Sequence, residues 1–146
     1  MLRTLLLSGL LALFCCVDMH MYAQQGPSTS MSYESHNQVD PKPLKVHSIN
    51  GVARDDEGNV VPSVMVGIFT EKDHKLIETT ETSNKGEFVF KYGSPGRYRV
   101  VAKHPAFCTA NVPVIISGNG AGHPHRILEL HMKVGGIDTC SFGSLR

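Results

Sequence analysis

Apolar and polar residues alternate along the middle of the chain with the period of two that is typical of β-strands. The alternation is clearest in the stretch Gly86–Val100, where Phe88 and Tyr98 each belong to such a run. Between the two runs, Pro95 supplies a fixed φ and Gly96 a permissive residue, which together suit a reversal of the backbone. This stretch is therefore predicted to be a hairpin of two strands.

Five further strands are predicted by the same alternation and by the turn residues between the runs. They cover residues 46–54, 60–68, 76–82, 112–116 and 126–134. Pro113 favours an edge position or a bulge for the fourth of these. Leu128, Leu130, Met132 and Val134 are predicted to point inward in the last strand. The pattern predicts an all-β fold, a seven-stranded antiparallel Greek-key β-sandwich.

The first 23 residues have the layout of a secretory signal peptide. A positive start precedes the apolar run Leu5–Val17, and Ala23 offers a small residue for cleavage. A retained membrane anchor is the alternative, but the run is shorter than the roughly 20 residues that span a bilayer. Phe14 before Cys15 argues against a lipoprotein, in which a small residue usually precedes the lipidated cysteine. The chain is therefore predicted to be secreted or periplasmic, without a membrane span after cleavage.

The remaining chain divides into a flexible leader (residues 24–45), the sandwich (46–134) and a C-terminal tail (135–146). Of the four cysteines, only Cys108 and Cys140 remain after signal cleavage. Two cysteines in an oxidising compartment favour one disulfide, which would fold the tail back beside the strand at residues 112–116. Two unpaired thiols are the alternative.

The formal net charge of the chain is +1, and no basic stripe is present. Proteins that bind nucleic acid or anionic membranes usually carry a basic surface. Binding to nucleic acid is therefore excluded from the predicted functions.

The order and spacing of the turn residues resemble those of the carboxypeptidase regulatory-like domain. The residues that carry the resemblance are Gly51, Gly58, Pro62, Gly86, Phe88, Pro95, Gly96 and Tyr98. The chain departs from the family pattern at Ser83-Asn84 and at Phe107-Cys108, which affects loop detail. The resemblance implies a prealbumin-like (transthyretin-like) sandwich, a fold often grouped with carbohydrate-binding modules.

Members of this family are mostly non-catalytic accessory modules of secreted or envelope proteins. The resemblance therefore implies a binding or scaffolding role without a cofactor, with an envelope or secreted protein as partner and a glycan as a further possibility. Outward polar candidates for the working surface are Arg97, Arg99, Lys103 and His131. Fold alone does not identify a ligand.

Two other functions are weighed against this prediction. Hydroxyisourate hydrolases share the fold and use paired histidines and an arginine, so His47, His131 and Arg54 are candidates if the first and last strands pair. The chain lacks the Tyr-Arg-Gly-Ser ending of those enzymes, and no positioned partner for a general base is evident. A carbohydrate module would need exposed aromatic rings, and with no Trp the candidates are Tyr92 and Phe107.

Metal binding has little support in the sequence. His123 and His125 form a speculative surface site with His131 or His104, but two adjacent imidazoles are too few ligands for a defined transition-metal centre. The acidic turn at residues 55–57 falls short of the six or more oxygen ligands that Ca²⁺ takes. No metal, cofactor or catalytic residue is predicted.

Overall fold

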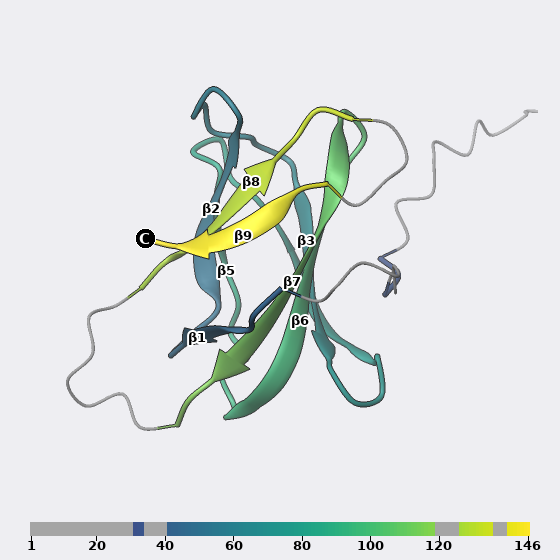
Figure 1. The fold of residues 1–146 in the computed structure, drawn as a ribbon, viewed down its shortest axis with the longest axis vertical. Helices are drawn as coiled ribbons and strands as arrows, with labels where there is room; N and C mark the ends of the chain where they lie inside the picture. The colour runs from purple at the N-terminus through teal and green to yellow at the C-terminus, as the bar shows by residue number, and fades with distance from the viewer. Residues whose placement is uncertain (1–30, 34–40, 119–125, 136–139) are drawn as a thin grey trace, which may run out of the picture.

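The computed structural model describes residues 31–33, 41–118, 126–135 and 140–146, and every regular element in these ranges is a β-strand. Nine strands form two sheets that face each other (Figure 1). The five-stranded sheet has the order β1-β7-β6-β3-β4, and its strands are β1 (Leu44–Val46), β3 (Met65–Thr70), β4 (Leu76–Glu81), β6 (Gly96–His104) and β7 (Phe107–Ile116). The four-stranded sheet has the order β5-β2-β8-β9, and its strands are β2 (Asn50–Asp55), β5 (Glu87–Val89), β8 (Leu128–Met132) and β9 (Phe142–Leu145).

One apolar cluster fills the space between the sheets, and both sheets contribute alternate side chains to it because successive residues of a strand point to opposite faces. Its fully buried large members include Val46, Ile49, Val64, Val66, Ile68, Phe88, Val100, Val114, Leu128, Leu130 and Met132. Burying each such side chain stabilises the fold by roughly 1.5–3 kcal/mol. This packing therefore holds the two sheets together.

The predicted all-β sandwich is confirmed, with two differences in detail. There are nine strands rather than seven, because β1 begins within the predicted leader and β9 lies within the predicted tail. Two strand pairs, β1 with β7 and β2 with β8, are parallel rather than antiparallel. Each of these pairs joins strands that are far apart in the sequence, whereas a tight turn can only produce an antiparallel pair.

Several strand boundaries also differ from the prediction. The run predicted as one strand over residues 46–54 is divided between the two sheets, with Ile49 buried where the chain crosses. Val134 lies beyond the end of β8 and is 80% exposed rather than inward. Pro113 lies in β7, which is an interior strand, but β1 pairs only with Val114–Ile116, so at Pro113 only β6 pairs.

The stretch Gly86–Val100 is not a hairpin, so that prediction was wrong. Its first strand, β5, pairs with β2 in one sheet, and its second strand, β6, pairs with β3 and β7 in the other. The connection passes β4, where the backbone N–H groups of Lys91 and Tyr92 donate hydrogen bonds to the Glu78 carboxylate (3.3 and 3.1 Å). The stretch therefore links the two sheets across their edge, and Phe88 and Tyr98 enter the same core from opposite sides.

Two tyrosines fix the end of this connection. The Tyr98 hydroxyl donates a hydrogen bond to the carbonyl oxygen of Ser94 (3.1 Å) and lies 3.0 Å from the Tyr92 hydroxyl. The two rings meet edge to face, with centroids 5.4 Å apart. Burial, the hydrogen bond to Tyr92 and the charge of a Tyr92 phenolate together raise the pKa of Tyr98 to about 12.

Tyr98→Phe is expected to lower the free energy of unfolding by roughly 1 kcal/mol, the contribution of one hydrogen bond. Because the folded-state pKa of Tyr98 lies above its unfolded value, the stabilisation is complete below pH 10 and is lost as the pH rises towards 12. Ultraviolet titration of the phenolates should show one late-titrating tyrosine that this substitution removes. Titration of all the tyrosines in a single step would contradict the prediction.

The predicted disulfide between Cys108 and Cys140 is confirmed, with Cα atoms 5.4 Å apart. It joins the start of β7 to the segment just before β9. Ser141 completes the junction, because its buried hydroxyl donates to the carbonyl oxygen of Cys108 (2.8 Å) and accepts from the N–H of Lys133 (2.9 Å). These bonds fix the C-terminal segment beside β7 and β8.

Replacing both cysteines, Cys108→Ala with Cys140→Ser, is expected to lower the free energy of unfolding by roughly 3–4 kcal/mol, because the bond joins residues separated by 32 positions. Denaturant unfolding of the oxidised protein and the variant measures this difference. Reducing agent should lower the stability of the wild-type protein and leave that of the variant unchanged. Equal stability of the two oxidised proteins would contradict the prediction.

The predicted signal peptide and most of the predicted leader lie outside the described residues. Within the ranges that the structure describes, no helix is long and apolar enough to cross a membrane.

Candidate functional site

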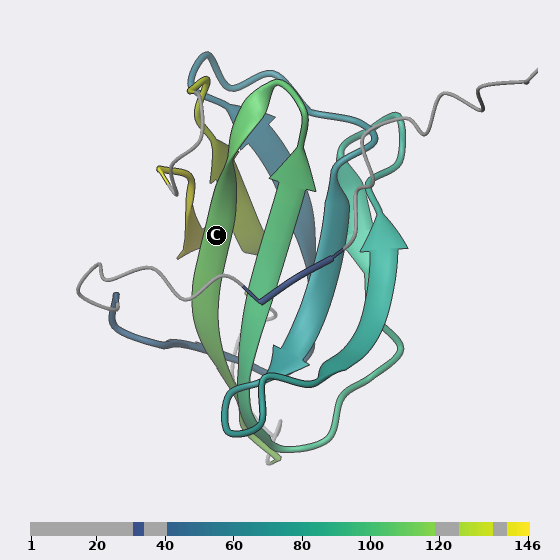
Figure 2. The same ribbon diagram turned by 90° about the vertical axis from the view of Figure 1, so that its right-hand side faces the viewer.

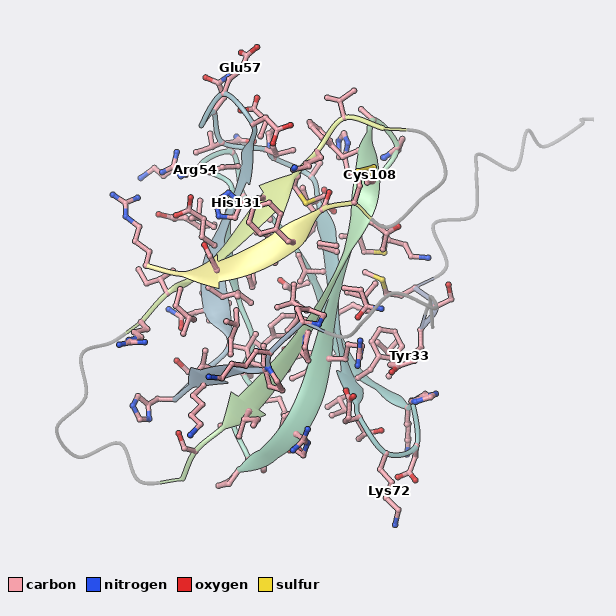
Figure 3. The ribbon with its side chains drawn as sticks, in the orientation of Figure 1. Tyr33, Arg54, Glu57, Lys72, Cys108 and His131 are labelled. Carbon is pink, nitrogen blue, oxygen red and sulfur yellow. A yellow bond between two sulfur atoms is a disulfide. The ribbon has the colours of Figure 1, made fainter. Side chains whose placement is uncertain are left out.

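Polar side chains converge on the outer face of the four-stranded sheet. Arg54 on β2 is paired in register with His131 on β8, and Glu129 on β8 with Ser144 on β9. These four residues and Phe142 on β9 are called the His131 cluster below. Figure 3 shows Arg54 and His131 on neighbouring strands at this face. The alternation of each strand places them outward, because the intervening residues point into the core.

Glu129 and Ser144 both approach the same nitrogen of His131. His131 Nε2 lies 2.8 Å from Ser144 Oγ and 3.9 Å from Glu129 Oε1. The same Glu129 oxygen lies 4.0 Å from Arg54 Nε. A serine–histidine–carboxylate relay needs the hydroxyl and the carboxylate on opposite ring nitrogens. The arrangement therefore lacks the geometry of such a relay and forms a half-buried polar network.

Phe142 gives this network an apolar surface. Its ring stacks on the imidazole of His131 with centroids 4.5 Å apart and an angle of 15° between the planes. The ammonium group of Lys133 lies 5.5 Å from the ring centroid, which is within the range of a cation–π contact. Phe142 is nevertheless 45% exposed, which leaves a surface that another molecule can cover.

The turn after β2 positions Arg54. Arg54 Nη1 donates a hydrogen bond to the carbonyl oxygen of Gly58 (2.7 Å). Asp55 organises that turn, since its Oδ1 accepts from the N–H groups of Glu57 (3.0 Å) and Asn59 (2.8 Å). Desolvation acts to raise the pKa of Asp55, but hydrogen bonds from the Asn59 side chain and from the backbone outweigh it and lower the pKa below its ordinary value of 3.8.

The structure brings together only part of the residue set considered for a hydrolase. Arg54 and His131 are neighbours, as their register requires. The predicted first and last strands do pair, through β2 and β8, but their register places Arg54 opposite His131. His47 lies between β1 and β2, outside this pairing, and does not face His131. Among the described residues, no group of three or more histidine, cysteine or acidic side chains could hold a metal ion. His123 and His125 lie outside those residues, and His104 accepts a hydrogen bond from the N–H of Ala106.

Two of the predicted surface features are corrected by the structure. Arg99 points to the outer face of its sheet but is not available at the surface, because it is only 5% exposed and donates two hydrogen bonds to the carboxylate of Glu71 (2.8 and 3.1 Å). Arg97 is exposed, as expected. Tyr92 and Phe107 are partly buried and pack against the core rather than standing free in loops.

Sequence reasoning missed Phe142, the exposed aromatic ring of the site. It lies in a segment without strand-like alternation, which was predicted to be a tail. The available signal was its position two residues after Cys140, since a disulfide at that point brings the following residues back onto the sandwich.

The residues that carry the family resemblance lie in turns, in strands and in the core, and one of them, Gly58, contacts the His131 cluster through Arg54. Gly58 and Gly86 have φ values of 86° and 71°, in the left-handed region that favours glycine. Phe88 and Tyr98 are buried. The remaining four lie in β2 (Gly51), in the connection from β2 to β3 (Pro62), just before β6 (Pro95) and at the start of β6 (Gly96).

Comparison with known proteins places these observations in a family. The fold is that of the transthyretin-like β-sandwiches. The family model of the carboxypeptidase regulatory-like domain matches residues 48–125, which is more than half of the sequence, and the chain belongs to this family. No curated protein matches the sequence.

The fold is similar to that of 5-hydroxyisourate hydrolase from Klebsiella pneumoniae, with a TM-score of 0.50 and 17% identity over 68% of this chain and 98% of that one. Transthyretin from Sparus aurata matches with a TM-score of 0.47, 17% identity and the same two coverages. At these identities the likeness concerns the fold alone.

The lowered pKa of Asp55 predicts a pH dependence of stability. Because the pKa of Asp55 in the folded protein lies below its ordinary value of 3.8, the stabilisation is complete above that value and is lost as the pH falls through the folded-state pKa. Asp55→Asn should therefore reduce the loss of stability below pH 4, measured as the urea midpoint against pH. The matched control is Asp56→Asn, which removes a carboxylate from the same turn and leaves the hydrogen bonds of Asp55 in place. Identical profiles for Asp55→Asn and the wild-type protein would contradict the prediction.

Proposed function

We propose that this chain is an exported, non-catalytic binding module that uses the His131 cluster to hold a protein partner in the cell envelope or outside the cell. The observation that carries the proposal is the stack of Phe142 on His131, an open aromatic ring surrounded by charged groups. Export is supported by the signal-like N-terminus and by the disulfide, which is typical of oxidising compartments.

The composition of this surface suits a protein interface. Aromatic residues and arginine are enriched at the centre of such interfaces, and they account for most of the residues that dominate binding energy. Phe142 supplies the aromatic ring, and Arg54 supplies a guanidinium whose Nε lies 4.0 Å from Glu129 Oε1 on the same face. β9 is also an edge strand of its sheet, so the backbone beside Phe142 can contribute to a contact.

The non-catalytic part of the proposal rests on the geometry around His131. Glu129 and Ser144 share one ring nitrogen, so the carboxylate does not orient the imidazole for proton abstraction from the hydroxyl. The hydrolase among the structurally similar proteins supports the fold and does not transfer its activity to this chain.

A carbohydrate ligand is the second candidate, and Phe142 is the observation that favours it. An exposed aromatic ring can stack against a sugar, and Arg54, Glu129 and Ser144 offer hydrogen-bonding groups beside it. A glycan array distinguishes the two candidates. If the array shows glycan binding and Phe142→Ala abolishes it, the ligand of this surface is a sugar and not a protein.

Photocrosslinking tests the proposed surface directly. A benzophenone side chain in place of Phe142 should crosslink a protein in extracts of the exported fraction, and the same group in place of Val89 should not. Val89 is the matched control because it is 65% exposed on β5 of the same sheet but lies outside the His131 cluster.

Binding of the crosslinked partner should weaken roughly tenfold or more in Phe142→Ala, since a central aromatic anchor contributes about 2 kcal/mol. Val89→Ala should bind as the wild-type protein does. Equal crosslinking at the two positions would contradict the proposed surface. If the protein accelerates the hydrolysis of hydroxyisourate and His131→Ala abolishes this activity, the non-catalytic assignment is contradicted.

A further inference from the structure

A second candidate binding surface lies on the outer face of the five-stranded sheet. Residues 31–33, from the predicted leader, lie across β3 and β6 on this face (Figure 2). Phe69 on β3 and Val101 on β6 point to this side rather than into the central core, yet they are only 2% and 0% exposed. The sheet is therefore covered where these two side chains lie, and they do not meet solvent.

Tyr33 is held by three side chains from different parts of the chain. Its ring stacks on the imidazole of His74 with centroids 3.7 Å apart and planes 8° from parallel. It meets the ring of Phe69 edge to face at 5.9 Å, and the guanidinium carbon of Arg99 lies 5.5 Å from its centroid. His74, Phe69 and Arg99 are called the tyrosine clamp below, and Figure 3 shows Tyr33 above the loop that carries His74.

Arg99 is held in the clamp by contacts that do not involve residues 31–33. The two hydrogen bonds from Arg99 to Glu71 hold the guanidinium plane, and Arg99 Nη1 also donates to Asn111 Oδ1 (3.2 Å). His74 has a positive φ of 52°, a conformation that non-glycine residues seldom adopt and that tends to mark functional positions. The clamp is thus arranged by the sheet and its turn, as expected of a preformed binding site.

The two residues before Tyr33 have their own contacts. Met31 lies over Gly67, where an added Cβ would come within 2.8 Å of the Met31 Cγ. The absence of a side chain at Gly67 leaves the space that Met31 fills. Ser32 Oγ accepts a hydrogen bond from Lys103 Nζ (2.9 Å). All three leader residues therefore contact residues of the same face of the sheet.

We propose that this face is a binding site for an extended peptide with a tyrosine anchor, and that residues 31–33 of the chain itself are its resident ligand. Gly67 receives the apolar residue two positions before the tyrosine, and the tyrosine clamp receives the ring. The leader is a tethered ligand, and a partner that binds here must offer a similar segment to displace it. This surface is on the opposite sheet from the His131 cluster and does not depend on the function proposed for that cluster.

Tyrosine-to-tryptophan substitution tests the occupancy of the site. The chain contains no tryptophan, so Tyr33→Trp in the full chain places a single indole fluorophore at the clamp. We expect acrylamide to quench its emission several-fold less than that of a free peptide with the same leader sequence. Quenching equal to that of the free peptide would overturn the proposal.

Two further substitutions, each combined with Tyr33→Trp, sharpen this test. His74→Gly removes the stacking partner while a positive φ suits glycine, so the fold is retained, and quenching of the introduced indole should rise towards the free-peptide value. Gly67→Val fills the space under Met31 and should have the same effect. Lys72→Ala is the matched control, because Lys72 lies in the same turn as His74 and points away from Tyr33 in Figure 3.

Binding in trans tests the peptide specificity. The full chain with Tyr33→Ala leaves the clamp open to a synthetic peptide of residues 29–35. Calorimetry should show binding of this peptide, and at least tenfold weaker binding of the same peptide with alanine in place of the tyrosine. Equal binding of the two peptides, or no binding of either, would overturn the assignment of a tyrosine-anchored site.

Discussion

The packing of two apolar sheet faces against each other is the constraint on which the rest of the structure depends. Both sheets must supply alternate side chains to one core, and the chain crosses between them to do so. Among these crossings are the one before β2, at Ile49, and the one between β5 and β6, where Phe88 and Tyr98 meet the core from opposite sheets. Because the inner faces are used for this packing, the outer faces and the edge strands are the surfaces left for recognition.

The C-terminal segment converts one of these outer faces into a site. The Cys108–Cys140 disulfide and the hydrogen bonds of Ser141 fix the chain beside β7 and β8, and β9 follows directly. β9 then supplies both the hydroxyl beside His131 and the ring stacked on it. The disulfide is therefore important for the candidate site as well as for stability, since it brings these groups into register with β8.

The two outer faces differ in how their charges are used. On the four-stranded sheet, Arg54 and Glu129 lie half-buried beside an exposed ring. On the five-stranded sheet, Arg99 is buried, paired with Glu71, and covered by the ring of Tyr33. The first face is open among the described residues, and the second is occupied by the chain itself. The two outer faces thus differ in exposure, and each carries one of the two proposed binding sites.

The sequence by itself determined the all-β class, the family and most of the inward-facing residues, because alternation of period two and turn residues at fixed positions are local properties. It also restricted the disulfide to the pair Cys108 and Cys140. Only the tertiary structure decided which strands are neighbours. The apparent hairpin at Gly86–Val100 belongs to two sheets, Arg99 lies under Tyr33, and Phe142 stacks on His131. Alternation says which side chains share a face, whereas contacts between residues far apart in the sequence depend on how the sheets pack, which local pattern does not encode.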